Sequence, residues 1–322
     1  MAKPKIAFYW CASCGGCEEA VVDLAEDILK VVEAVDIVFW PCALDLKRTD
    51  VEAMEDGSIA VTFINGAINS DELEEMVHIL RKKSQLIVAF GSCSHLGGIP
   101  GLANLTDKAS ILKSVYLTGP TNVNQSKTIP LAKSPSPDGE LHLPELKENA
   151  LALDQVIDVD YYIPGCSVPK KLILDAVTAI LTGNLPPKGS VLAPTRTNCD
   201  TCERNKTKPE KLTITKFYRP YEIELDEEKC FLAQGVICMG PVTRGGCDER
   251  CIKGNMPCRG CFGPVDNVYD QGAKFISALA SLFDAKTDEE VQAIVDTIQD
   301  PAGTFYRFSV AKSMLGHKVS KE

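Results

Sequence analysis

Histidine is scarce in this chain of 322 residues, which has only four: His78, His95, His142 and His317. None of them lies beside a Cys-x-x-Cys pair. Any metal site must therefore be formed almost entirely by thiolates, and sites of that kind hold iron–sulfur clusters or zinc. For the histidines themselves we expect surface or hydrogen-bonded positions and not metal ligation.

Positive charge is also in short supply, because 34 Lys and Arg stand against 44 Asp and Glu and the formal net charge is −10. Binding of a nucleic-acid backbone needs clustered Lys and Arg, so we expect no nucleic-acid partner. No apolar run approaches the length of a membrane span, which is about 20 residues. The first residues, MAKPKIAFYW, contain neither a secretory hydrophobic segment nor a twin-arginine signal. We therefore expect a cytoplasmic chain with no membrane span.

Cysteine, by contrast, is abundant, with fourteen residues. In a cytosolic chain, cysteines more often bind metal or carry redox chemistry than form disulfides. The chain is also 45% hydrophobic, and at this length it can bury a substantial core and form two domains.

The first half of the sequence alternates strand-like and helix-like segments. Apolar positions at helical spacing run from Cys17 to Val35, over 73–80 and over 171–181, with Asn69 or Ser70 as an N-cap of the second helix and Gly183 ending the third. Short apolar runs predict strands at 6–10, 35–40, 59–64, 86–91 and 159–163. Strands that alternate with helices indicate an α/β fold with a mostly parallel, doubly wound sheet.

The rest of the sequence departs from this alternation. Residues 118–150 are rich in Pro, Ser, Asn and Lys and predict a long surface excursion, functional or facing a partner. Residues 195–264 hold eight cysteines and little periodic apolar pattern, so we expect little core there and a large contribution of bound metal to folding. Helices are expected near 269–285 and 287–299. These features predict an N-terminal domain over 1–185 and an irregular, metal-stabilised domain over 186–322.

Four cysteines follow predicted strands. In an open parallel sheet, ligands bind beyond the carboxyl ends of the strands, so these thiolates should meet at one edge and form a four-ligand site. Neighbouring glycines (Gly15, Gly16, Gly91 and Gly165) permit tight turns there, and the start of the helix near Cys17 favours an anionic group. The four cysteines are Cys14, Cys17, Cys93 and Cys166.

The remaining cysteines are harder to group. Eight of them suffice for two four-thiolate sites, and sequential grouping is the simplest, although spacing alone also allows interleaved ligands. Taken singly, the two Cys-x-x-Cys pairs fit zinc as well as iron–sulfur. The eight are Cys199, Cys202, Cys230, Cys238, Cys247, Cys251, Cys258 and Cys261.

Cys11, Cys14 and Cys17 satisfy the first three positions of a ferredoxin pattern, but the fourth falls on Val21. From spacing alone, Cys11 and Cys14 could have been the ligand pair instead of Cys14 and Cys17. We expect Cys11 and Cys42 to be buried free thiols, because free cysteine is among the most buried residue types.

Taken together, the motifs resemble the small subunit of [NiFe] hydrogenases. The resemblance covers nearly the whole chain except 118–150 and about the last 50 residues, and within the family the likeness is to the small (gamma) subunits of the F420-non-reducing hydrogenases of methanogens. It rests on SCGGCEE (13–19), GSCSHLGGIP (91–100), IPGC (163–166), the Cys-x-x-Cys at 199–202 and the cysteine-rich run at 230–264.

The resemblance implies a flavodoxin-like N-terminal domain and three [4Fe–4S] clusters. The proximal cluster would be held by Cys14, Cys17, Cys93 and Cys166. The distal cluster would be held by Cys199, Cys202, Cys230 and Cys238. The medial cluster would be held by Cys247, Cys251, Cys258 and Cys261. Below, these groups are called the proximal, distal and medial cysteines.

The chain departs from better-known members of the family at several positions. Many of them have His where this chain has Cys199, and Pro with a [3Fe–4S] cluster where it has Cys251, so a fourth thiolate favours a medial [4Fe–4S] cluster here. Oxygen-tolerant members carry extra cysteines where this chain has Gly16 and Gly98, which predicts ordinary oxygen sensitivity.

The resemblance also implies what the chain does. Hydrogen activation would take place on the large subunit, so we expect no catalytic residue here, only electron transfer toward an acceptor. Implied partners are the large hydrogenase subunit, a small iron–sulfur delta subunit and heterodisulfide reductase. The charge of the clusters could be offset by four basic residues, for which a solvated surface position is the alternative: Arg204, Arg244, Arg250 and Arg259.

Other functions fit part of the sequence. An F420-reducing hydrogenase or a sulfhydrogenase would use a similar small subunit, whereas a quinone-reductase subunit with one cluster would not need the eight later cysteines. A zinc-ribbon scaffold without redox activity is a further alternative, which four thiolates at the edge of a parallel sheet disfavour.

Overall fold

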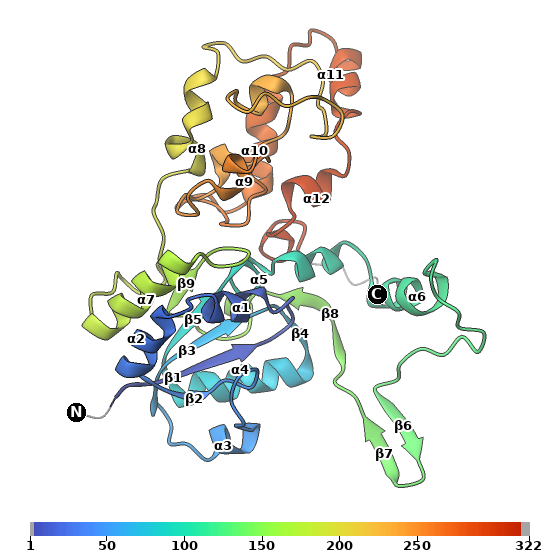
Figure 1. Ribbon diagram of the computed structural model, residues 1–322. Coiled ribbons are helices and arrows are strands. Elements are labelled where there is room, and N and C mark those ends of the chain that lie inside the picture. Colours follow the sequence, from blue (N-terminus) through green and yellow to red (C-terminus); the bar gives the residue numbers. More distant parts are fainter. Residues whose placement is uncertain (1–2, 317–322) are drawn as a thin grey trace.

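A five-stranded parallel sheet forms the centre of the N-terminal half in the computed structural model, which describes residues 3–316 (Figure 1). The strand order is β2-β1-β3-β5-β9, and every neighbouring pair is parallel. This is the flavodoxin-like order, so the predicted α/β class is confirmed. The strands are β1 (Lys5–Trp10), β2 (Asp36–Phe39), β3 (Ile59–Asn65), β5 (Ser84–Phe90) and β9 (Tyr161–Ile163).

Helices cover both faces of this sheet. Alternate residues of β1 show the division, because Phe8 packs in one hydrophobic cluster and Ala7 in another. The first cluster contains side chains of α1 (Gly16–Val22), α2 (Asp27–Ala34) and α7 (Lys170–Thr182). The second contains side chains of α3 (Arg48–Glu52) and α4 (Asp71–Lys83). Strands buried on both faces explain the continuous apolar run at 86–90.

Local signals set the ends of several helices. Ser70 caps α4 by accepting a hydrogen bond from the Leu73 amide at 3.4 Å, and Gly183 ends α7 in a left-handed conformation. The single helix expected from Cys17 to Val35 is wrong, because the chain turns between α1 and α2, with Ala25 at φ 52°. The same apolar residues still reach the core, from two shorter helices.

The surface excursion at 118–150 is largely exposed but not structureless. It follows α6 (Lys108–Lys113) and forms a hairpin of β6 (Lys133–Ser136) and β7 (Gly139–His142) that extends away from the sheet (Figure 1). Its last residues enter β8 (Leu146–Leu151), which pairs with β4 (Ile68–Ser70). The excursion is therefore anchored at its end by a second, antiparallel sheet.

The C-terminal half is mainly irregular, with short helices: α8 (Asn198–Thr201), α9 (Arg250–Lys253), α10 (Gln271–Ala280), α11 (Asp288–Val295) and α12 (Pro301–Phe305). The expectation of little core is wrong, because Phe217, Phe231 and Val236 pack with Phe275 and Phe305 in a third hydrophobic cluster. Non-periodic apolar residues from the loops meet α10 and α12 there. Within residues 3–316, no helix is long and apolar enough to cross a bilayer.

The end of the chain returns to the N-terminal half. The Gly98 amide, just after α5 (Ser92–Leu96), donates to the Phe308 carbonyl at 3.1 Å, and the Gln155 side chain donates to the Ala311 carbonyl at 3.0 Å. Lys312 pairs with Asp154 at 2.6 Å. These contacts join the two halves, and the division between residues 185 and 186 stays a prediction.

Candidate metal centres

The proximal cysteines meet at the carboxyl edge of the parallel sheet. Cys14 follows β1, Cys17 and Cys93 lie in the first turns of α1 and α5, and Cys166 follows β9. Burial, together with the neighbouring thiols of Cys93 and Cys166, raises the pKa of the Cys17 thiol to about 12. The sheet therefore brings together four residues that are far apart in sequence.

Two glycines leave room for the sulfurs of this group. Gly91 has φ 87°, and a Cβ atom there would lie 2.4 Å from the Cys17 sulfur. Gly98 has φ 56°, and a Cβ atom there would lie 2.4 Å from the Cys93 sulfur. Any side chain at either position would overlap a sulfur, so these glycines give the sulfurs their space.

The distal cysteines line a single pocket, with Arg204, Asn205 and Lys208 at its wall. Cys238 is buried, and the other three are half-buried. The Cys199 sulfur lies 3.4 Å from the amide oxygen of Asn205. The structure thus brings together the residues that sequential grouping placed at one site: Cys199, Cys202, Cys230 and Cys238.

The medial cysteines also lie close to one another. Burial raises the pKa of Cys258 to about 11, and the nearby thiols of Cys247 and Cys251 contribute to this rise. Burial likewise raises the pKa of Cys261, and again Cys258 and Cys247 add to it. Cys251, the second residue of α9, is the exposed member of the group.

The three groups adjoin one another in series. The Cys258 amide of the medial group donates to the Cys238 sulfur of the distal group at 3.3 Å. At the other end, the backbone of Cys166 in the proximal group hydrogen-bonds the Cys261 thiol and opposes the pKa rise that burial causes. The medial group therefore touches both of the others.

The donor chemistry fits iron–sulfur clusters. All fourteen cysteines lie within the described residues, and all are free thiols. Burial and mutual repulsion disfavour several thiolates packed together, and a cationic iron core would offset both effects. In residues 3–316 no three His, Cys, Asp or Glu side chains are grouped around the position of a single metal ion, whereas a [4Fe–4S] cluster takes its four thiolates on four different iron atoms.

The four basic residues differ in environment. Arg204 is 8% exposed, donates to Asn255 at 3.0 Å and stacks over Phe231, so the solvated alternative is wrong for it. Arg244 is 2% exposed and pairs with Asp266, so that alternative is wrong for it too. Arg250 is exposed, and Arg259 is half-buried.

The prediction for the two remaining cysteines is half right. Cys11 is 5% exposed in the sheet core, as expected. Cys42 is exposed, because it lies in the turn after β2, where Trp40 fills the core instead. Of the histidines, His78 and His142 are exposed as expected, and His317 lies outside the described residues.

Sequence reasoning missed two buried polar residues beside the proximal cysteines. Glu18 is 6% exposed and accepts hydrogen bonds from the side chains of Trp40 and Asn65; burial raises its pKa. His95 is 7% exposed, lies against the Tyr162 ring and has an unpaired Nδ1 atom. The sequence shows two acidic residues, Glu18 and Glu19, directly after Cys17, but only the fold shows that Glu18 is buried.

The class of protein follows from the fold and from a family match. Residues 14–180 match the family described as NADH ubiquinone oxidoreductase, 20 Kd subunit. The fold is similar to that of a chain in the [NiFeSe] hydrogenase of Desulfovibrio vulgaris Hildenborough, with a TM-score of 0.52, 17% identity and coverage of 83% of this chain and 95% of that one. These matches define a subunit of an oxidoreductase complex with the fold of hydrogenase small subunits.

Full-length relatives are more specific. The chain is 39% identical to an iron-sulfur subunit of the F420-non-reducing hydrogenase of Archaeoglobus profundus, over 98% of this chain and 99% of the relative. It is 35% identical to the corresponding F420-non-reducing hydrogenase subunit of Methanothermobacter thermautotrophicus, over 99% of this chain and 98% of the relative. The chain belongs to this family of F420-non-reducing [NiFe] hydrogenase small subunits.

Proposed function

We propose that this chain is the electron-transfer subunit of a cytoplasmic [NiFe] hydrogenase and holds three [4Fe–4S] clusters. The observation that carries the proposal is the series of four-cysteine groups, in which the medial group contacts both the proximal and the distal one. Bound clusters would supply one-electron transfer between the two ends of this series. The chain itself supplies thiolate ligands, backbone hydrogen bonds and burial, which set the potentials of the clusters.

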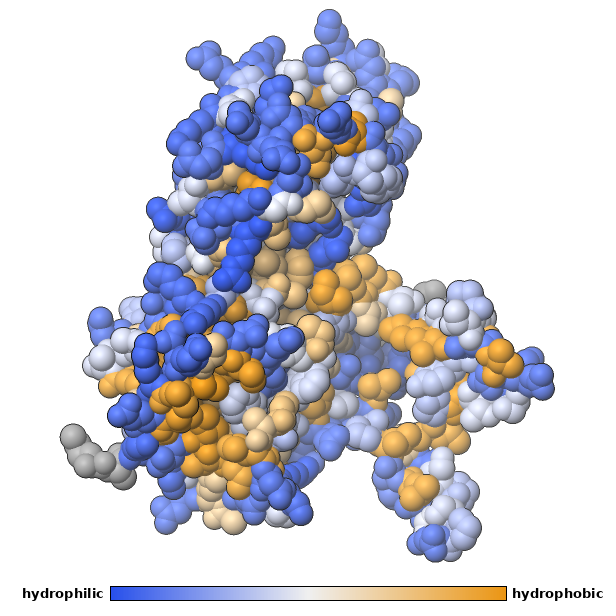
Figure 2. Space-filling view, viewed as in Figure 1, coloured by the Kyte–Doolittle hydropathy of each residue, from blue (hydrophilic) through white to orange (hydrophobic). Residues whose placement is uncertain are grey.

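The proximal end is the expected contact with the large subunit. Cys14 and Cys166 are exposed at this edge of the sheet. Exposed hydrophobic side chains lie nearby along the chain, including Trp10 at 42% and Val22 at 59%. Figure 2 shows hydrophobic surface gathered over the region of α1 and α2. A large-subunit interface here would bury this surface and exclude water from the proximal cysteines.

The distal end is the expected exit for electrons. Cys202 lines the pocket of the distal cysteines and also a second, more open pocket at the surface, beside Glu203 and Lys253. By resemblance, the acceptors would be a small iron–sulfur delta subunit and then heterodisulfide reductase. Such partners would approach the face that carries this second pocket.

Anaerobic purification with analysis of metals and co-purifying subunits tests the proposal. We expect brown protein with about twelve iron and about twelve acid-labile sulfide per chain, together with a large subunit. A colourless protein that contains zinc and no sulfide would contradict the iron–sulfur assignment. Co-purification of a subunit that binds flavin and F420 would move the chain to the F420-reducing alternative.

Replacement of Cys251 by Pro tests the medial assignment. The variant should lose one thiolate ligand, so the medial [4Fe–4S] cluster should become a [3Fe–4S] cluster, with a loss of about one iron per chain. Electron paramagnetic resonance of the oxidised protein would show the new signal. Cys42→Ser is the matched control, since Cys42 is also exposed and belongs to none of the three groups. If the spectrum of Cys251→Pro is the same as that of the wild type, the medial assignment is wrong.

A further inference from the structure

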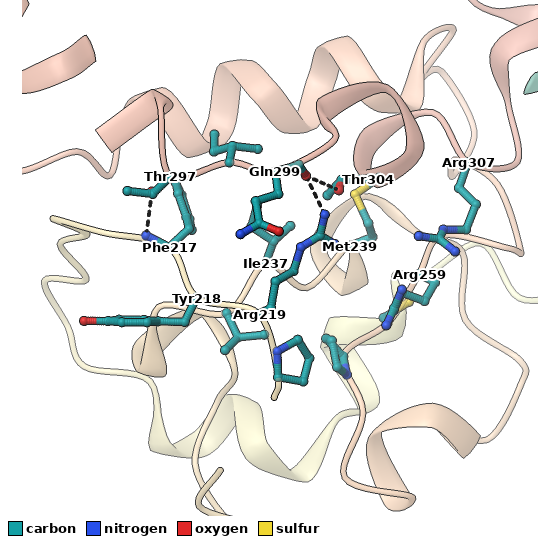
Figure 3. Close-up of a pocket in the computed structure, with 15 residues that line it drawn as sticks. Phe217, Tyr218, Arg219, Ile237, Met239, Arg259, Thr297, Gln299, Thr304 and Arg307 are labelled. Carbon is teal, nitrogen blue, oxygen red and sulfur yellow. Dashed lines mark hydrogen bonds between the residues drawn. The ribbon is translucent and has the colours of Figure 1, made fainter. Parts of the chain in front are cut away.

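A pocket in the C-terminal half brings together three arginines from different segments of the chain. Arg219 enters it from the loop after Phe217, Arg259 from the medial cysteine segment, and Arg307 from the residues after α12. Figure 3 shows the guanidinium groups of Arg259 and Arg307 pointing toward one another, with that of Arg219 beside Gln299. All three side chains are half-buried.

These arginines have few partners. Arg219 donates to the Gln299 carbonyl at 2.7 Å, and Arg307 donates through Nε to the Gly303 carbonyl at 3.0 Å. Within residues 3–316 the Arg259 side chain makes no hydrogen bond, and none of the three arginines is paired with a carboxylate.

Two hydroxyl groups of the pocket are already engaged. The Thr297 hydroxyl donates to the Ile294 carbonyl at 2.6 Å and accepts from the Phe217 amide at 2.9 Å. The Thr304 hydroxyl donates to the Gln299 carbonyl at 3.3 Å. The guanidinium groups are the charged hydrogen-bond donors of the pocket, and apolar side chains such as Ile237 and Met239 form part of its wall.

Three like charges packed together without a counter-charge are unfavourable, and an apolar wall increases the cost by lowering the local dielectric. Guanidinium forks match the oxygens of a tetrahedral oxyanion. The cavity has a volume of about 40 Å³. One water needs about 10–15 Å³, so the cavity has room for a group of a few heavy atoms, such as a tetrahedral oxyanion, but not for a nucleotide.

The geometry points to a binding site for a phosphate-class dianion, held by Arg219, Arg259 and Arg307 next to the medial cysteine Cys258. The ligand is either free phosphate or the terminal phosphate group of a small metabolite, because both present the same oxygens to the arginines. Offsetting the charge of a medial cluster is the competing role for these residues, and it predicts no saturable binding of an added anion.

Equilibrium dialysis of the anaerobically purified complex against radiolabelled inorganic phosphate, in about 0.15 M NaCl, tests the site. We expect saturable binding of one phosphate per chain. Arg307→Gln should weaken it by about tenfold to a hundredfold, because one charge-assisted fork is lost. Arg307→Lys should weaken it less, because the charge is kept. Glycerol 3-phosphate and unlabelled phosphate are then compared as competitors of the radiolabelled phosphate. If glycerol 3-phosphate competes as strongly as unlabelled phosphate, the ligand is a phosphorylated metabolite; if it competes more weakly, the ligand is the free ion.

Arg48→Gln is the matched control, because it removes the same charge from the N-terminal half, where Arg48 pairs with Glu52 and Glu75. It should leave phosphate binding unchanged. The iron content of each variant verifies that it is folded, and Arg219→Gln provides a second variant should Arg307→Gln fail this check. Absence of saturable binding up to about 10 mM phosphate, or wild-type affinity in both Gln variants, overturns the proposal.

Discussion

At the scale of single residues, the absence of a side chain decides the geometry around the proximal cysteines. Gly91→Ala would place a methyl group 2.4 Å from the Cys17 sulfur at φ 87°. If the three proposed [4Fe–4S] clusters are bound, the displaced sulfur should remove the proximal one, about four of about twelve iron atoms, and the backbone strain should cost about 1–3 kcal/mol. Iron analysis and thermal unfolding under anaerobic conditions measure the two effects.

Gly57→Ala separates the strain from the overlap. Gly57 also has a positive φ, of 70°, but nothing lies within 4 Å of the added methyl group. This control should lower stability by about 1 kcal/mol and keep all of the iron. Full iron content in Gly91→Ala as well would mean that the close approach to Cys17 does not matter for metal binding.

Several single residues could not have been placed from the sequence. The apolar pattern shows which positions are buried on average, but Arg244 is buried because the Pro194 carbonyl and Asp266 accept its hydrogen bonds. Cys42 is exposed because a neighbour, Trp40, takes the core position. Both outcomes depend on contacts between distant segments, which a local pattern does not contain.

At the scale of elements, Asp160 ties together the strands and the helix at the amino end of the sheet. It lies just before β9, bonds Arg81 of α4 at 2.6 Å and Lys188, and accepts from the Ile87 amide of β5 at 2.8 Å. Burial raises the pKa of Asp160, but these partners outweigh burial and lower the pKa below its usual value.

Asp160→Asn should lower the free energy of unfolding by about 2 kcal/mol at pH 7, because the charge-assisted bonds weaken. A depressed pKa in the folded state stabilises the protein above the pKa of the unfolded chain, which is about 3.9, and this contribution disappears as the pH falls through the lowered value. The difference between wild type and variant should therefore be constant near neutrality and shrink below about pH 4. Thermal unfolding of both proteins across this pH range measures it.

Asp56→Asn is the control for this pH dependence. Asp56 also pairs with two basic residues, Lys82 and Lys83, but its side chain is 52% exposed. Solvent screens such pairs, so the change should cost less than about 1 kcal/mol. If the difference in stability between wild type and Asp160→Asn does not vary with pH, the charge of Asp160 is not the source of its contribution to stability.

At the scale of the whole molecule, the returning C-terminal segment joins the halves that carry the proximal and the distal cysteines. Ala311 is 1% exposed, and its Cβ atom packs so closely on Gly97 that a Cβ atom added at Gly97 would lie 2.3 Å from it. Ala311→Leu would overfill this contact and should destabilise the docked segment by about 1–3 kcal/mol. Hydrogen exchange at 308–313 should become faster.

Met314→Leu is the matched substitution, since Met314 is 80% exposed and the change conserves volume. It should leave exchange at 308–313 as in the wild type. If hydrogen exchange at 308–313 is as slow in Ala311→Leu as in the wild type, the segment tolerates displacement and does not hold the halves together.

The sequence by itself determined the α/β sheet and the edge of that sheet at which the cysteines after its strands meet. Alternation of apolar runs and helical periods fixes which segments become strands and helices, and the carboxyl ends of parallel strands must share one edge. Cys93 and Cys166 could therefore be predicted to lie near the cysteines that follow β1, whereas the choice of Cys17 over Cys11 rested partly on resemblance. Grouping of the later cysteines rested on order along the chain and on resemblance.

Only the tertiary structure decided how the groups lie relative to one another and what surrounds them. The contact of Cys258 with Cys238, the return of the chain end and the meeting of Arg219, Arg259 and Arg307 all join segments of irregular backbone. Irregular segments have no period from which a partner can be inferred. Their positions follow from packing against the whole fold, and that packing exists only once the chain has folded.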